Sequence, residues 1–63
     1  MKINGKQMPH EAITLLEYLQ RHDYREDCVV IERAGEIITR ERFGDVWLQE
    51  HDDINILQFM GGG

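Results

Sequence analysis

Short apolar runs separated by polar turns divide the 63-residue chain into several expected strands and one helix. Residues 1–8 read as two short strands on either side of Asn4-Gly5, a dipeptide that readily adopts the positive φ angles of a tight hairpin turn. A second hairpin is expected over residues 28–39, because a β-branched run is followed by Ala34-Gly35 and then by a further apolar pair. The pattern therefore predicts two hairpins.

A helix is predicted to begin at Thr14, because the segment from Thr14 to Glu17 has the form of a capping box. In such a box, the Thr hydroxyl and the Glu carboxylate satisfy backbone N–H groups that have no partner in the first helical turn. The apolar residues that follow recur at helical spacing and define one broad face: Leu15, Leu16, Tyr18 and Leu19. We expect this face to pack on a sheet.

Residues 40–49 are ambiguous. Their apolar positions fit one helical turn followed by an irregular cap over the core: Phe43, Val46, Trp47 and Leu48. The order of elements, ββαββ with a short element before the last strand, predicts an α+β roll: a mixed sheet of four to five strands with one main covering helix. We expect residues 1–60 to form a single small domain, without room for a large catalytic cleft, and residues 61–63 to form a flexible glycine tail.

The last strand has a clear alternation. It points Ile54 and Ile56 to one face and Leu57 and Phe59 to the other. One interpretation is that Leu57, Phe59 and Met60 complete a core too small to leave apolar residues outside. The other is that they form an exposed apolar patch for partner docking, because the two isoleucines already fill the inward face.

Composition and charge narrow the classes of function. A formal net charge of -5 argues against nucleic acid as the partner and favours a basic protein. The single cysteine, Cys28, cannot form an internal disulfide, and we expect it to be a small buried hydrophobic residue. No signal peptide and no apolar run of about 20 residues is found, so we expect a soluble cytoplasmic protein with no membrane partner.

No catalytic or metal-binding constellation stands out. The three histidines lie in separate segments without the close spacing typical of metal ligands, so no metal site is expected. The acidic pairs Glu26-Asp27 and Asp52-Asp53 are expected to be solvated turn residues. We assign no catalytic residue to this chain.

The sequence Gly61-Gly62-Gly63 instead suggests that the C-terminal carboxylate is the reactive group of this chain. Glycines lack a Cβ, so Gly61 and Gly62 could thread a narrow channel and present the Gly63 carboxylate to ATP. An extended tripeptide reaches only about 10 Å, so the domain would have to dock close to the enzyme that receives its tail. The alternative is a frayed terminus without function.

In this order and length, the features resemble the ThiS family, sulfur carriers of thiazole formation in thiamin biosynthesis with a ubiquitin-like β-grasp fold. The resembling segments run through the chain: residues 1–5, Thr14-Leu15 with Leu19, residues 29–32 and 35–38, Arg40, Leu48, residues 52–54 and the glycine tail. Three turn positions depart from the family pattern, namely Ala34, Thr39 and His51.

The resemblance implies that a ThiF-like adenylyltransferase couples Gly63 to AMP and that sulfur from a donor protein then replaces AMP. The resulting thiocarboxylate would supply sulfur to a ThiG-like thiazole synthase. The chain itself would be no enzyme and would bind no cofactor, with ATP and Mg used by the activating partner. Three alternatives stay open: a related carrier for molybdopterin or another sulfur metabolite, a ubiquitin-like modifier joined to lysines through Gly63, and an interaction domain with an inert tail.

Overall fold

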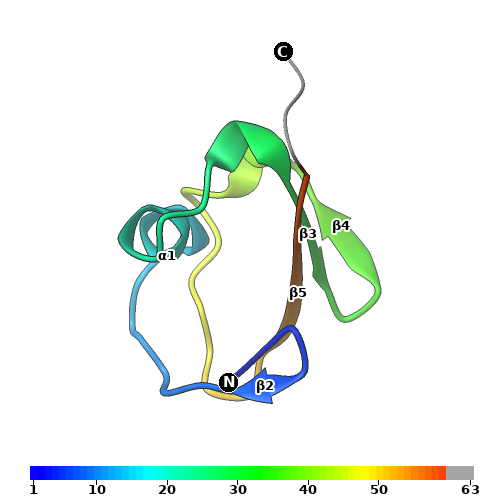
Figure 1. The fold of residues 1–63 in the computed structure, drawn as a ribbon. Coiled ribbons are helices and arrows are strands. Elements are labelled where there is room, and N and C mark those ends of the chain that lie inside the picture. Colours follow the sequence, from blue (N-terminus) through cyan, green and yellow to red (C-terminus); the bar gives the residue numbers. More distant parts are fainter. Residues whose placement is uncertain (60–63) are drawn as a thin grey trace.

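The computed structural model describes residues 1–59 and shows a five-stranded mixed sheet with one α-helix packed across one face (Figure 1). The strands are β1 (Lys2–Ile3), β2 (Lys6–Gln7), β3 (Val29–Arg33), β4 (Glu36–Ile38) and β5 (Asp53–Gln58). The helix is α1 (Leu15–Arg21), and two short 3₁₀ turns are η1 (Glu26–Cys28) and η2 (Arg40–Arg42). The predicted α+β roll is confirmed.

The last strand lies at the centre of the sheet. The strand order is β2-β1-β5-β3-β4, with β5 parallel to β1 and antiparallel to β3. The pairing of β5 with β3 covers five residue pairs, from Val29 opposite Gln58 to Arg33 opposite Ile54. The hairpins β1–β2 and β3–β4 therefore meet only through β5.

Both hairpin turns use left-handed backbone. Asn4 and Gly5 have φ angles of 54° and 77°, and Ala34 and Gly35 have φ angles of 53° and 82°. Asparagine tolerates this region well, whereas an alanine Cβ crowds the following carbonyl. The Asn4-Gly5 turn is the predicted one, and the second turn holds Ala34 in a conformation that its side chain disfavours.

The predicted start of the helix is confirmed. The Thr14 hydroxyl accepts a hydrogen bond of 3.2 Å from the Glu17 backbone N–H, which otherwise has no partner in the first turn. Leu15, Tyr18 and Leu19 are buried against the sheet. Leu16 lies at the edge of this face and is partly buried.

The segment after η2 closes the core opposite the sheet. Its backbone pairs with the start of α1, where Leu15 N–H donates to the Val46 carbonyl at 2.8 Å and Leu48 N–H donates to the Ile13 carbonyl at 3.0 Å. Phe43, Val46 and Leu48 are buried, as predicted for a cap. Trp47 does not join them: its side chain points outward and is 58% exposed, because an extended segment alternates its side chains.

Two smaller expectations can be compared with residues 1–59. Cys28 is a free thiol and is buried, as predicted. Within this part of the chain, no helix has the length and apolar character needed to cross a bilayer.

Candidate functional site

The outer face of the sheet carries the apolar residues that the alternation of β5 predicted. Ile54 and Ile56 are buried under α1, whereas Leu57 is 67% exposed and Phe59 is 49% exposed. The predicted facing of the strand is thus confirmed, and the reading that Leu57 and Phe59 complete the core is wrong. Their role in docking stays a prediction.

Two further apolar side chains from the other hairpin share this face. Val30 on β3 lies directly opposite Leu57, and Ile37 on β4 lies opposite Glu32, one step along the same face. Val30 is 39% exposed and Ile37 is 61% exposed. We call the four apolar side chains, Val30, Ile37, Leu57 and Phe59, the outer patch.

Sequence analysis missed the contribution of β3 and β4 to this patch. The period of two along β3 could have pointed Val30 outward once Ile31 was taken as core. Its position beside Leu57 depends on the register between β3 and β5, which are separated in the sequence by residues 34–52. Only the folded sheet brings these side chains together.

The outer patch lies where the described chain ends. Beyond β5, the Phe59 N–H still donates to the Cys28 carbonyl at 3.0 Å, so the backbone is held against η1 up to this residue. Met60, Gly61, Gly62 and Gly63 lie outside the described residues. The docking role of Met60 and the threading and modification of the glycines stay predictions.

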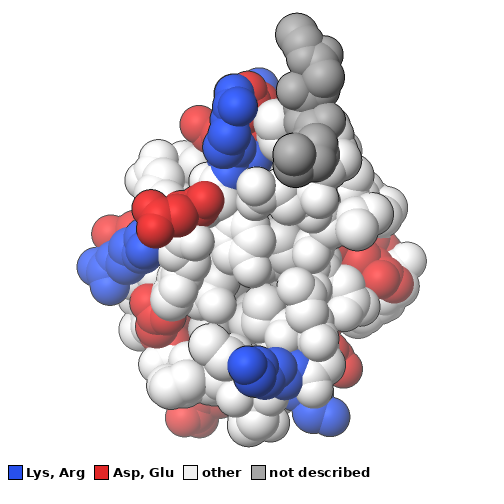
Figure 2. Space-filling view, viewed as in Figure 1, with Lys and Arg blue, Asp and Glu red and all other residues white. Residues whose placement is uncertain are grey.

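A polar pair interrupts the apolar surface. Asn55 on β5 donates from Nδ2 to Glu32 Oε1 on β3, with a distance of 3.2 Å between the atoms. The two residues face each other directly across the strands. Figure 2 has the view of Figure 1, with α1 on one side and the sheet nearly edge-on, and from this side the charged side chains lie mainly around the margin of the molecule.

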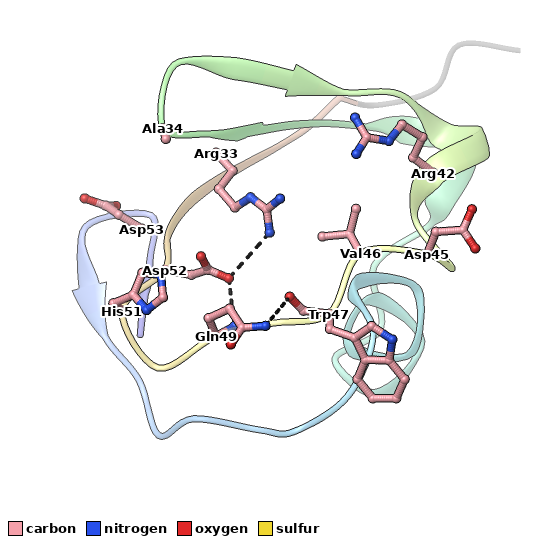
Figure 3. Close-up of a pocket in the computed structure, with 10 residues that line it drawn as sticks. All are labelled: Arg33, Ala34, Arg42, Asp45, Val46, Trp47, Gln49, His51, Asp52 and Asp53. Carbon is pink, nitrogen blue, oxygen red and sulfur yellow. Dashed lines mark hydrogen bonds and ion pairs between the residues drawn. The ribbon is translucent and has the colours of Figure 1, made fainter.

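An open groove with a volume of about 550 Å³ lies elsewhere, between the tip of the β3–β4 hairpin and residues 45–53 (Figure 3). One of its lining residues, Asp52, is a buried carboxylate. Asp52 accepts a hydrogen bond of 2.8 Å from Gln49 N–H and lies 3.7 Å from the Arg33 guanidinium. Asp52 is therefore not the solvated turn residue that we expected, because it fixes the loop that leads into β5.

Metal chemistry finds no support in this groove. Within residues 1–59, no group of three or more His, Cys, Asp or Glu side chains could hold a metal ion. His10 and His22 are tied to structural partners: one ring nitrogen of His10 lies 3.1 Å from the Leu48 carbonyl, and His22 lies 2.8 Å from Glu11. Exposed apolar side chains gathered on one face, as in the outer patch, are typical of protein interaction sites, and a docking role for this patch stays a prediction.

Comparison with known proteins identifies the family. The ThiS family model matches residues 1–63. The chain belongs to the ThiS family. It is 34% identical over 65 residues to the sulfur carrier protein ThiS of Bacillus subtilis (strain 168), with all of this chain and 98% of that protein aligned.

Other relatives agree with this ThiS assignment. The crystal structure of the thiamine biosynthesis protein ThiS from Geobacter metallireducens matches with a TM-score of 0.79 and 30% identity, covering 98% of this chain and 96% of that one. A thiazole synthase of Magnetococcus marinus is 39% identical over 66 residues, which include all of this chain but only 20% of that protein. The predicted ThiS family of sulfur carriers and the β-grasp fold are confirmed.

Proposed function

We propose that this ThiS-family chain carries sulfur for thiazole formation in thiamin biosynthesis, as a thiocarboxylate on Gly63. The observation that carries the proposal is an exposed apolar face on β5, the strand that leads directly into the glycine sequence. A free apolar patch suits recognition by an enzyme, and glycines without side chains suit entry into its active site. The chain acts as a carrier and not as an enzyme.

The chemistry requires activation, because a carboxylate is a poor electrophile. A ThiF-like adenylyltransferase joins the Gly63 carboxylate to the AMP portion of ATP and releases pyrophosphate. Sulfide supplied by a donor protein then attacks the carboxyl carbon: the new C–S bond forms, the C–O bond to AMP breaks, AMP leaves with its electron pair, and a thiocarboxylate remains on Gly63. ATP and Mg belong to the activating enzyme, and this chain binds no cofactor of its own.

Chain geometry makes docking part of the reaction. From Phe59, the last described residue, the four residues that follow can reach at most about 14 Å. An enzyme that acts on Gly63 must therefore cover the end of β5. We place Leu57, Phe59 and Met60 in this contact, together with Val30 and Ile37 from the neighbouring hairpin.

A thiazole synthase is the second partner in this proposal. The Magnetococcus marinus relative is named as a thiazole synthase, and a fifth of that protein aligns with this whole chain. The presence of such a domain within that protein supports a working pair formed by a ThiS-type carrier and a ThiG-like enzyme. The cytoplasmic location expected from the sequence fits a pathway that uses ATP, and it stays a prediction.

Mass spectrometry of the intact chain tests the proposal. The protein is incubated with ATP, Mg, a ThiF-like adenylyltransferase from the same organism and sulfide, then alkylated and fragmented. We expect an alkylated thiocarboxylate that maps to Gly63, and none in a variant that lacks Gly62 and Gly63. Fragment mapping is essential because oxidation of a methionine adds nearly the same mass as exchange of oxygen for sulfur. An unmodified Gly63 in the presence of an enzyme that binds the chain would refute the carrier function.

A further inference from the structure

The outer patch is not uniformly apolar, because a carboxylate lies within it. Glu32 stands directly between Asn55 on β5 and Ile37 on β4. The next pair on the same face is Val30 and Leu57. Side chains at such positions are near neighbours, so Glu32 borders the apolar groups on two sides.

The Glu32 carboxylate is only partly satisfied within the domain. Its Oε1 accepts the hydrogen bond from Asn55 Nδ2 at 3.2 Å. In the part of the chain that the structure describes, no lysine, arginine or histidine forms an ion pair with Glu32. The adjacent Arg33 points to the other side of the sheet, where it lies 3.7 Å from Asp52 (Figure 3). Among residues 1–59, the second carboxylate oxygen of Glu32 therefore accepts no hydrogen bond or ion pair and is left for a partner.

Docking changes the surroundings of this carboxylate. A partner that covers Val30, Ile37 and Leu57 must also remove water from Glu32, and a carboxylate that loses water without gaining a cation opposes binding. A basic side chain on the partner would turn the same carboxylate into a selective contact. The net charge of -5 acts in the same direction, because it favours a basic partner surface.

We propose that Glu32 is a specificity-determining residue and that the activating enzyme places a lysine or arginine against its free oxygen, inside an otherwise apolar contact. This inference rests on the proposed function, since it assumes that the activating enzyme covers the outer patch. Leu57 and its apolar neighbours supply contact area, and Glu32 selects for a surface with a positive charge at one position. Enzymes that present only an apolar surface there are disfavoured by the carboxylate.

The direction in which one substitution changes the affinity for the activating enzyme tests this inference. Glu32→Gln keeps the size of the side chain and an oxygen that accepts from Asn55, but it removes the charge. If a cation faces Glu32, Glu32→Gln weakens binding; if only apolar groups face it, the substitution removes a desolvation penalty and tightens binding. Glu36→Gln is the matched control, because Glu36 lies on β4 in the same hairpin and on the opposite face to Ile37.

The measurement is calorimetric titration with a ThiF-like adenylyltransferase from the same organism. We expect Glu32→Gln to weaken binding about tenfold, or roughly 1.4 kcal/mol, and Glu36→Gln to change it less than twofold. We also expect added salt to weaken binding of the wild type more than that of Glu32→Gln. Weakening of less than threefold by Glu32→Gln, or any tightening, would overturn the inference.

A further variant separates this inference from the proposed function. Leu57→Asp should abolish docking whatever faces Glu32. If Leu57→Asp loses binding and Glu32→Gln does not, the outer patch is the docking surface and the cationic contact is wrong. If Leu57→Asp binds like the wild type, the activating enzyme does not use this face and the inference fails. The carrier function then still depends on whether Gly63 becomes modified.

Discussion

The Asn4 side chain supplies a hydrogen-bond acceptor to β5 at a position beyond the end of β1. β1 pairs with β5 only at Lys2 and Ile3, so the Ile56 N–H lies beyond the last pair. Asn4 Oδ1 accepts from this N–H at 2.7 Å, and its backbone N–H donates to the Ile54 carbonyl at 2.9 Å. The Asn4 backbone is left-handed, with a φ of 54°. One residue thus combines an acceptor for β5 with a turn that disfavours most side chains.

These two roles can be separated by substitution. A polar N–H left without a partner costs about 1–3 kcal/mol, and a left-handed residue with a Cβ costs about 1–2 kcal/mol. We expect Asn4→Gly to lose about 1–3 kcal/mol, because only the hydrogen bond is removed, and Asn4→Ala to lose about 1 kcal/mol more. Asn4→Asp, which keeps an oxygen acceptor, should lose least. A domain of this size has a total stability of roughly 3–9 kcal/mol, so these losses are large.

Urea unfolding at constant pH measures the free energy of unfolding of all three variants. Thermal unfolding gives an independent value, since a change of about 1 kcal/mol shifts Tm by roughly 4–8 °C in a small domain. Equal losses for Asn4→Gly and Asn4→Ala would refute the argument from the φ angle. A loss below about 0.5 kcal/mol in both would show that the bond to Ile56 contributes nothing measurable. An Asn4→Asp variant as unstable as Asn4→Gly would show that the acceptor is not what matters.

Two further predictions concern the core. Leu19→Ala should reduce the free energy of unfolding by about 2–5 kcal/mol, because Leu19 is fully buried. Leu57→Ala on the outer face should reduce it by less than about 0.5 kcal/mol. Similar reductions for the two variants in urea unfolding would contradict the assigned facing of these side chains. Burial raises the pKa of Tyr18 above its usual 10.0, with Tyr24 and Glu11 adding to the effect, so the folded state favours the protonated phenol. Stability should therefore fall as the pH rises above 10.0, and fall less steeply in Tyr18→Phe; parallel pH profiles would exclude this cause.

Local patterns predicted much of this fold. The Asn4-Gly5 turn, the Thr14 cap and the alternation along β5 each depend on neighbouring residues and on backbone geometry that is fixed over a few positions. The family resemblance extended these local predictions to the order of the whole chain. The outward position of Leu57 followed from the alternation alone.

Other features depend on contacts between distant segments. Sequence patterns gave no register for β3 against β5, so Val30 and the Glu32–Asn55 pair could not be placed in the outer patch. Asp52 looked like any acidic turn residue, because its burial depends on Arg33 from another hairpin. Trp47 was expected over the core because hydrophobicity alone does not say which residues of an irregular segment face inward.

Because β5 lies at the centre of the sheet, the outer patch forms only in the fully folded domain. Val30 and Ile37 come from one hairpin and Leu57 from the strand that joins it to the other hairpin, so the outer patch exists only when β5 has inserted between β1 and β3. An unfolded chain has the same three glycines but no assembled patch. In the proposed function, the activating enzyme would therefore bind folded carriers and not unfolded ones. Only folded molecules would then be adenylated and receive sulfur.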